Sequence, residues 1–319
     1  MKTPISCFES TVPALTLEEL QRLPRNCPLI YDNDWFRDTP DDDYLMAKAQ
    51  LGQANLRGFI LTKDLWDQGK MYRVAQGQKE FAESREIWQR NGWKNLPELT
   101  VGADRVLIRP TSGAIEDTTP QRSPGAELII REARKARPEQ PLLIFVGGPL
   151  NTVVNAYLLD PSIAPRLLVF MTDLTGYNGQ DKWANYIAAS RLRMVNFGAS
   201  PLWWSQRPAE ASLYRPMLNR LPKTAVTEEL IRLGALFDER RGRNERDDGF
   251  ADGAGLFLYF VPESWKAVRK MQVAPNGVTK PADSSPYYLD ATAVDFNRMR
   301  DEFFATIAKA YSIMTKITV

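Results

Sequence analysis

The 319-residue chain contains no histidine. This absence excludes Ser-His-Asp and Cys-His nucleophile triads, HExxH zinc sites and any histidine acting as acid or base. An enzyme of this composition has to move protons with carboxylates, Lys, Tyr or a metal-bound water. Cysteine is nearly as scarce. The two that are present, Cys7 and Cys27, cannot build a disulfide scaffold and cannot alone hold a structural zinc.

An excess of charge and a long apolar run are missing as well. With 41 Lys and Arg against 39 Asp and Glu, the net charge is only +2, which does not favour nucleic-acid binding through bulk charge. No apolar run approaches the roughly 20 residues that a membrane helix needs. The first ten residues include Glu9 and lack the apolar core of a signal peptide. We therefore expect a cytoplasmic protein with reduced thiols that binds neither nucleic acid nor membrane.

Apolar runs of strand length alternate with amphipathic stretches, which is the pattern of an α/β protein. Residues 142–146, Leu-Leu-Ile-Phe-Val, are uninterrupted by polar residues, as expected of a central parallel strand that is buried on both faces. They break at Gly147-Gly148-Pro149 before a predicted helix. The pattern predicts further strands at 27–31, 56–62, 99–101, 167–171 and 194–197, and helices at 43–50, 75–92, 127–135, 150–159 and 295–312.

The second half of the chain is less regular. Residues 238–253 are dense in charge and glycine, and because acids balance the arginines they indicate a surface loop or lid and not a basic patch. An apolar run follows at 256–261. Since no convincing linker interrupts the sequence, we expect a single domain over 1–319 with a helical C-terminal region at 263–319.

The strongest local signal is an acidic cluster directly after the first predicted strand. Six carboxylates lie within twelve residues, from Asp32 to Asp43, and they repel one another unless solvent or a cation lies between them. One interpretation is a solvated loop in which Asp43 caps a helix. The other is a hard-cation site at the carboxyl end of a parallel strand, where open α/β sheets place ligands. Carboxylate oxygens suit Ca²⁺ or Mg²⁺.

Two known acidic patterns can be compared with this cluster. An EF-hand loop needs Gly at its sixth position and Glu at its twelfth, where this chain has Arg37 and Asp43, so an EF-hand is excluded. A strand followed by Asp-x-Asp also resembles the aspartate-nucleophile phosphatases of the haloacid dehalogenase superfamily. In that alternative, Asp32 attacks phosphorus and Asp34 acts as acid and base.

The order of motifs along the chain resembles the inosine-uridine nucleoside hydrolase family. That family opens with a strand and a D-x-D-P-G-x-D-D motif that enters a helix, and its four acids are matched here by Asp32, Asp34, Asp42 and Asp43. The resemblance extends in collinear order over roughly residues 27–262.

Later segments carry the same resemblance. Residues 96–107, Leu-Pro-Glu-Leu-Thr-Val-Gly-Ala-Asp-Arg-Val-Leu, resemble the family's I-P-V-x-x-G-A-x-R-P-L segment. Residues 146–152 and 159–161, Val-Gly-Gly-Pro-Leu-Asn-Thr and Leu-Asp-Pro, resemble its L-G-P-L-T-N and L-D-P motifs. Residues 171–185 resemble its M-G-G…G-N…E-F-N segment, and Asp252 matches a late acid before an apolar helix.

The resemblance implies a mainly parallel central sheet flanked by helices, a Rossmann-like nucleoside hydrolase fold, with Ca²⁺ held at the strand ends. By this analogy the ligands or direct neighbours of the ion are Asp32, Asp34, Asp43, Asp252 and the backbone carbonyl of Asn151. The residues implied on the substrate side are Asp42, Asp64, Met171, Asn178, Trp183 and Asn185, among which Asp42, Asn178 and Asn185 hold ribose hydroxyls.

The activity implied is calcium-dependent hydrolysis of the N-glycosidic bond of a ribonucleoside or a modified one. Ca²⁺ lowers the pKa of a bound water, Asp34 takes the proton as general base, and the water attacks the anomeric carbon through an oxocarbenium-like state. The implied partner is a small-molecule nucleoside or related glycoside, and the family habit also allows a homo-oligomer.

The sequence departs from the family pattern in the substrate contacts more than in the acids. Seven residues, 35–41, stand where the family has three, Ala251 replaces the His before the late acid, and Trp183 replaces a Glu that binds the 5′-hydroxyl. Met171 is followed by Thr172-Asp173 where the family has Gly-Gly. These differences leave open a non-catalytic, calcium-dependent sugar- or nucleoside-binding protein on the same fold. The tryptophans that could stack on a base or pack in the core are Trp35, Trp183, Trp203 and Trp204.

Overall fold

The computed structural model describes residues 15–35, 41–65, 73–90, 92–198 and 254–314, together with Lys223 and Glu228. Strands from this part form one nine-stranded sheet in the order β3-β2-β1-β4-β5-β6-β9-β7-β8. The pairs from β3 across to β9 are parallel, and β7 pairs antiparallel with both β9 and β8. The strands are β1 (Pro28–Asn33), β2 (Asn55–Leu61), β3 (Leu99–Val101), β4 (Leu142–Val146), β5 (Leu167–Thr172), β6 (Arg193–Phe197), β7 (Trp265–Val273), β8 (Thr279–Pro281) and β9 (Tyr288–Val294).

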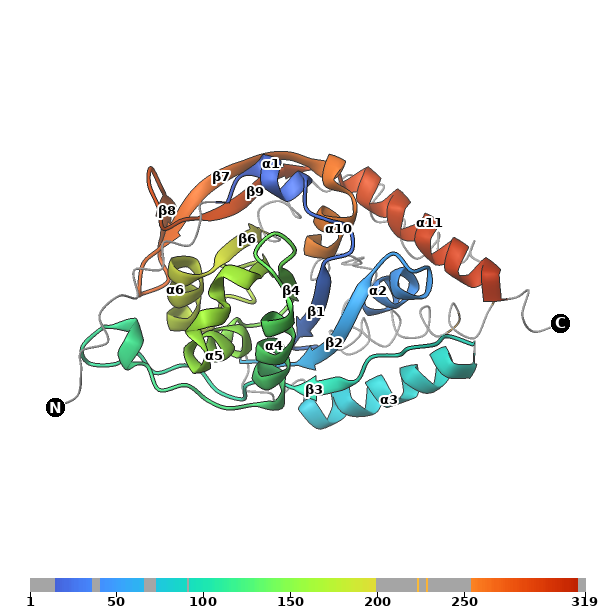
Figure 1. Cartoon of the computed structure of the whole chain (residues 1–319), viewed down its shortest axis with the longest axis horizontal. Helices are drawn as coiled ribbons and strands as arrows, with labels where there is room; N and C mark the ends of the chain where they lie inside the picture. The colour runs from blue at the N-terminus through green and yellow to red at the C-terminus, as the bar shows by residue number, and fades with distance from the viewer. Residues whose placement is uncertain are drawn as a thin grey trace, which may run out of the picture.

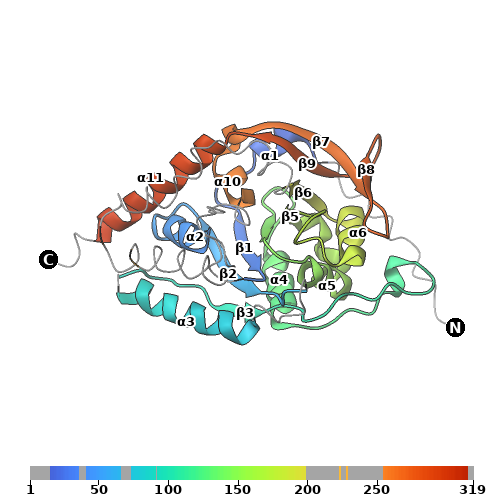
Figure 2. The same ribbon diagram turned by 180° about the vertical axis from the view of Figure 1, so that it is seen from behind.

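Helices cover both faces of this sheet, as Figure 1 and the reverse view in Figure 2 show. One hydrophobic cluster joins the strands to α2, α3, α10 and α11, and a second cluster joins them to α4, α5 and α6. The helices are α1 (Leu17–Gln21), α2 (Asp41–Gln50), α3 (Val74–Arg90), α4 (Pro124–Lys135), α5 (Asn151–Leu159), α6 (Lys182–Arg191), α10 (Ala254–Phe260) and α11 (Phe296–Met314), with 3₁₀ turns η1 (Ile115–Asp117), η2 (Pro161–Arg166) and η5 (Pro262–Ser264).

The central strands are apolar throughout because both of their faces are covered. In β1, Leu29 and Tyr31 belong to the cluster on the α2 side, whereas Ile30 belongs to the cluster on the α5 side. Successive side chains of a strand point to opposite faces, so Asp32 continues the α5 side of the sheet. The expected α/β class with a mainly parallel central sheet is therefore confirmed.

The C-terminal region corrects one expectation. Residues 263–294, expected to be helical, instead form η5 and the strands β7, β9 and β8 at one edge of the sheet, and only α11 is helical as expected. Only three of the nine positions of β7 are buried, so its sequence carries no apolar run of the kind that marked the central strands. The charged segment 238–253 lies outside the described residues. No helix among those described is long and apolar enough to cross a membrane.

Candidate functional site

The carboxyl ends of β1, β2 and β4 meet at one edge of the sheet and bring the first two acids with them. Asp32 pairs in register with Ile60 of β2 and Val146 of β4. Its side chain is fully buried, and Asp34 is only 3% exposed. A Cβ on Gly148 would lie 2.9 Å from the Cβ of Asp34. The turn after β4 can therefore approach Asp34 only because glycine stands there.

A chain of hydroxyl groups orients Asp32. The hydroxyl of Thr62 donates to Asp32 Oδ1 at 2.5 Å, and Thr62 Oγ1 lies 2.6 Å from Thr152 Oγ1. The backbone N–H of Ala103 donates to Thr152 Oγ1 at 2.8 Å. Each hydroxyl carries one proton, so with Asp32 ionised Thr152 donates to Thr62 and Thr62 donates to Asp32. A Cβ on Gly102 would lie within 2.4 Å of both threonine oxygens, so glycine is required beside this chain.

The other oxygen of Asp32 provides the main test for a bound cation. Oδ2 is buried and has no hydrogen-bond partner among the described residues. Burial raises the pKa of Asp32 to about 8, and the hydrogen bond from Thr62 opposes that shift. A buried carboxylate oxygen without a partner is costly, and a cation beside it would favour the charged form. The position and burial of Asp32 Oδ2 are therefore consistent with a cation that binds at the end of β1.

The acids of α2 are buried. Asp41, Asp42 and Asp43 occupy the first turn of the helix, and none is more than 1% exposed, so the solvated-loop interpretation is wrong for them. Carboxylates are favourable at this end of a helix. The indole N–H of Trp88, on α3, donates to Asp43 Oδ1 at 3.1 Å, and the Tyr31 hydroxyl hydrogen-bonds to Asp41.

The predicted calcium ligands are only partly brought together. Within the described ranges, no group of three or more Asp, Glu or Cys side chains is placed to hold a metal ion, and Asp252 lies outside those ranges. The carbonyl of Asn151 accepts the Asn155 side-chain amide at 2.8 Å, although a carbonyl oxygen has a second lone pair. The carboxylate oxygens of Asp32 and Asp34 are of the kind that Ca²⁺ prefers as ligands. One oxygen of Asp43, in contrast, already accepts the indole N–H of Trp88.

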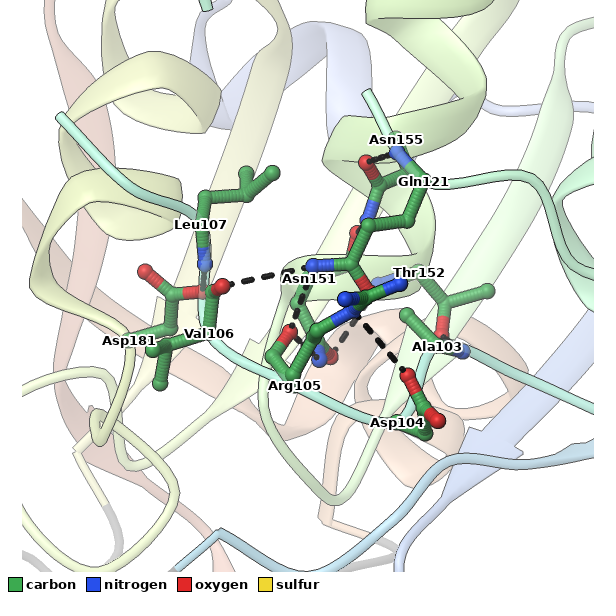
Figure 3. Close-up of polar contacts among 10 residues, drawn as sticks. All are labelled: Ala103, Asp104, Arg105, Val106, Leu107, Gln121, Asn151, Thr152, Asn155 and Asp181. Carbon is green, nitrogen blue, oxygen red and sulfur yellow. Dashed lines mark hydrogen bonds and ion pairs between the residues drawn. The ribbon is translucent and has the colours of Figure 1, made fainter. Parts of the chain in front are cut away.

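The segment 103–107 is held against the start of α5 (Figure 3). The side-chain amide of Asn151 donates to the carbonyl of Arg105 at 3.1 Å, and the Gln121 amide donates to the carbonyls of Arg105 and Val106 at 3.3 Å each. The N–H of Leu107 donates to Asp181 Oδ2 at 2.7 Å. Burial raises the pKa of Asp181 despite its bonds to backbone N–H groups. Asn151 thus has a structural role that the sequence did not predict.

The two asparagines expected on the sugar side both bind the loop that follows β5. Asn178 donates to the carbonyl of Thr172 at 3.2 Å. Asn185 donates to the carbonyls of Leu174 at 3.4 Å and Gly179 at 3.1 Å. The Oδ1 atom of Asn185 is buried and has no hydrogen-bond partner in the described part of the chain. This acceptor is therefore available to a ligand hydroxyl.

The loop after β5 contains a strained residue that replaces an expected glycine. Asp173 has φ of 61°, a left-handed conformation that glycine adopts more readily than other residues. Its Oδ2 accepts the N–H of Tyr177 at 2.7 Å, and its own N–H donates to the carbonyl of Phe197 at 2.7 Å. Met171, two residues earlier, is fully buried. Asp173 therefore adopts a left-handed conformation at a position where the family pattern has glycine.

Two tryptophans that could have stacked on a base are instead packed in the core. Trp35 is 3% exposed and donates its indole N–H to Asp64 Oδ2 at 3.2 Å. Trp183 is 4% exposed, donates to Thr118 Oγ1 at 3.0 Å, and lies under the Arg109 guanidinium at 5.3 Å. This packing accounts for both indoles, and for Asp64, without a ligand. Trp203 and Trp204 lie outside the described residues.

Comparisons with known proteins give matches in structure only. No family model and no curated protein matches the sequence. The purine-preferring ribonucleoside hydrolase from Gardnerella vaginalis superposes with a TM-score of 0.62 at 17% identity, over 90% of this chain and 99% of that one. The inosine-uridine preferring nucleoside hydrolase from Bacillus anthracis gives 0.57 at 14% identity, over 89% and 99%. The chain has the nucleoside hydrolase fold.

A nucleoside hydrolase fold is not confined to proteins described as hydrolases. The effector protein XOO4466 superposes on this chain with a TM-score of 0.58 at 12% identity, over 92% of this chain and 97% of that one. At such identities the likeness establishes the fold, and any activity has to be argued from the site.

Proposed function

We propose that this protein hydrolyses the N-glycosidic bond of a ribonucleoside or a related small glycoside. The observation that carries the proposal is the buried pair Asp32 and Asp34 at the carboxyl edge of the sheet, with Oδ2 of Asp32 left without a described partner. This edge is where open α/β sheets bind ligands. The chemistry needs no histidine, in keeping with a chain that has none.

In this proposal Ca²⁺ is held by Asp32 and Asp34, with Asp43, the Asn151 carbonyl and Asp252 as further ligands. When bound, the ion supplies a Lewis acid that lowers the pKa of a coordinated water. Thr62 keeps the side chain of Asp32 oriented through its hydrogen bond.

Asp34 is proposed to accept the proton of the attacking water as general base. The surrounding carboxylates stabilise the positive charge that develops on the sugar ring as the glycosidic bond breaks. Asp42, Asn178 and Asn185 are proposed to hold the sugar hydroxyls. Asp64, Met171 and Trp183, which are buried, are proposed to form the wall of the substrate pocket behind them. Because Trp183 stands where the family pattern has a Glu, the proposed pocket lacks that carboxylate for the 5′-hydroxyl, which favours substrates altered at that position.

A second candidate is a calcium-dependent nucleoside- or sugar-binding protein without catalysis. Its support is the hydrogen bond that ties Asp43 to Trp88 and the seven residues that separate Asp34 from Asp42. A displacement of about 1 Å at a catalytic group can cost about 100-fold in rate. The phosphatase alternative has less support, because the lysine it would use near this edge, Lys182, is exposed.

The test compares calcium binding with sugar release. Reducing-sugar release is measured on purine, pyrimidine and 5′-modified nucleosides, with Ca²⁺ and with a chelator, for wild type, Asp34→Asn and the control Asp301→Asn on the exposed face of α11. The hydrolase proposal expects calcium-dependent release that Asp34→Asn abolishes and Asp301→Asn retains. Calcium binding without release from any substrate would reject catalysis and favour the binding protein.

A further inference from the structure

Two adjoining cavities lie at the opposite edge of the sheet from the candidate site. The larger, about 620 Å³, is lined by the end of α2, the start of β2, the turn after α3 and α11. The smaller, about 350 Å³, lies beside the end of α4, and both are lined by Asn55 and Arg57. Arg57 lies in β2 five positions before Thr62, which directly follows that strand, a separation of about 16 Å. The cavities are therefore distinct from the acidic edge.

The described lining of these cavities is cationic. The larger contains Arg57 and Lys94 and no carboxylate. The smaller contains one acid, Glu132, which is paired with Lys135 at 2.8 Å and with Arg131 at 3.1 Å. Arg137 also lines it. Neither Arg57, Lys94 nor Arg137 makes an ion pair within the described part of the protein, so three cations face the cavities in a chain whose net charge is only +2.

Cations near helix ends often do no more than complement the helix dipole. Here carbonyls in the last turns of α2 and α3 already have backbone partners, since Leu51 donates to Ala47 and Trp93 donates to Trp88, each at 3.0 Å. Arg57 lies on a strand and not on a helix, so a helix dipole does not account for it. Its exposed guanidinium offers the planar set of donors that suits a phosphate group.

The walls of the larger cavity are fixed and partly aromatic. The side-chain amide of Gln50 donates to the Lys94 carbonyl at 2.6 Å and accepts the Lys94 N–H at 2.8 Å, which ties the turn after α3 to α2. Trp93 borders the cavity but is only 4% exposed, and its ring stacks on Trp88 with 6.2 Å between ring centroids. Asn95 adds an amide. The wall thus offers amide donors and acceptors, and the volume is that of a small-molecule site.

We propose that these cavities bind a phosphorylated small molecule of nucleotide size, with its phosphate groups on Arg57 between Lys94 and Arg137. The proposal does not depend on the hydrolase activity, because none of these residues belongs to the acidic edge.

The test is isothermal titration calorimetry with ADP, inorganic pyrophosphate and adenosine, in EGTA so that no calcium complicates the binding. Wild type is compared with Arg57→Gln, Lys94→Gln and the control Arg122→Gln. Arg122 is an exposed arginine paired with Glu127 that precedes the start of α4, whereas the smaller cavity lies beside the end of that helix. We expect one ADP per chain, at least about tenfold weaker binding after either cavity substitution, and little change in the control. Pyrophosphate should compete with ADP, and adenosine should bind at least about tenfold more weakly.

Three results would overturn the proposal. One is that neither ADP nor pyrophosphate binds the wild type. Another is that Arg57→Gln and Arg122→Gln weaken binding equally, which would indicate a diffuse charge effect. The third concerns Asp34→Asn, which should keep its ADP affinity; if this substitution removes ADP binding while Arg57→Gln does not, the nucleotide occupies the acidic edge instead.

Discussion

The hydroxyl chain that orients Asp32 gives a prediction whose size follows from the contacts. Thr62→Val keeps the shape of the side chain but removes the donor to Asp32 Oδ1 and the acceptor for Thr152. Both groups that lose a partner are buried. Each buried polar group left without a partner costs about 1–3 kcal/mol, so for the two groups we expect the free energy of unfolding to fall by roughly 2–6 kcal/mol. Thr62→Ser keeps the hydroxyl and loses one methyl group, which costs about 1 kcal/mol.

Urea unfolding followed by circular dichroism measures both substitutions. Thr152→Val breaks the same chain from the other side, so its effect and that of Thr62→Val should be less than additive in the double variant. The reasoning is refuted if Thr62→Val and Thr62→Ser have the same unfolding free energy, or if the two valine substitutions add fully. Either result would mean that the hydroxyls do not act as one hydrogen-bonded unit.

Three further predictions concern single groups. Trp88→Phe removes the indole donor to Asp43 and should change the affinity for Tb³⁺, a luminescent probe for calcium sites, whereas Trp93→Phe should not; equal effects would mean that stacking and not the hydrogen bond matters. The raised pKa of Asp32, about 8 against 3.8, means that the folded protein binds more protons than the unfolded chain over that interval. In EGTA its unfolding free energy should therefore contain a contribution that falls as pH rises from about 4 to about 8, and Asp32→Asn should remove that contribution; identical pH profiles for the two proteins would contradict this. Burial raises the pKa of the Cys27 thiol to about 11, so iodoacetamide at pH 8 should alkylate Cys27 only after unfolding, and modification of the native protein, mapped by mass spectrometry, would contradict its burial.

The sequence predicted the interior of the sheet well because burial on both faces leaves an unbroken apolar signal. The run 142–146 is β4 to the residue, and the predicted strand at 167–171 differs from β5 by one residue. The strands β7 and β8 were missed, since only three of the nine positions of β7 and none of the three positions of β8 are buried, and polar residues interrupt the pattern. Their place in the sheet comes from pairing, since β7 pairs with both β9 and β8.

The candidate site was predicted unevenly for a related reason. Carboxylates concentrated after a strand are conspicuous, so Asp32, Asp34 and the acids of α2 were candidates from the sequence alone. Thr62 and Thr152 were not, because a threonine carries no signal of its own and the two lie 90 positions apart. The burial of Trp35 and Trp183 could not be predicted from the sequence either. A tryptophan whose indole N–H has a partner can pack in a core as readily as it can stack on a base.

The most direct test of the proposed activity is chromatographic measurement of free nucleobase released from a mixed pool of nucleosides in Ca²⁺, per molecule of wild type and of Asp34→Asn. Removing a general base typically costs 10²–10⁴-fold. The account predicts many bases released per wild-type molecule and at least about 100-fold fewer from the variant. Less than one base per molecule from wild-type protein that has been shown to bind calcium, or equal release from both proteins, would contradict it.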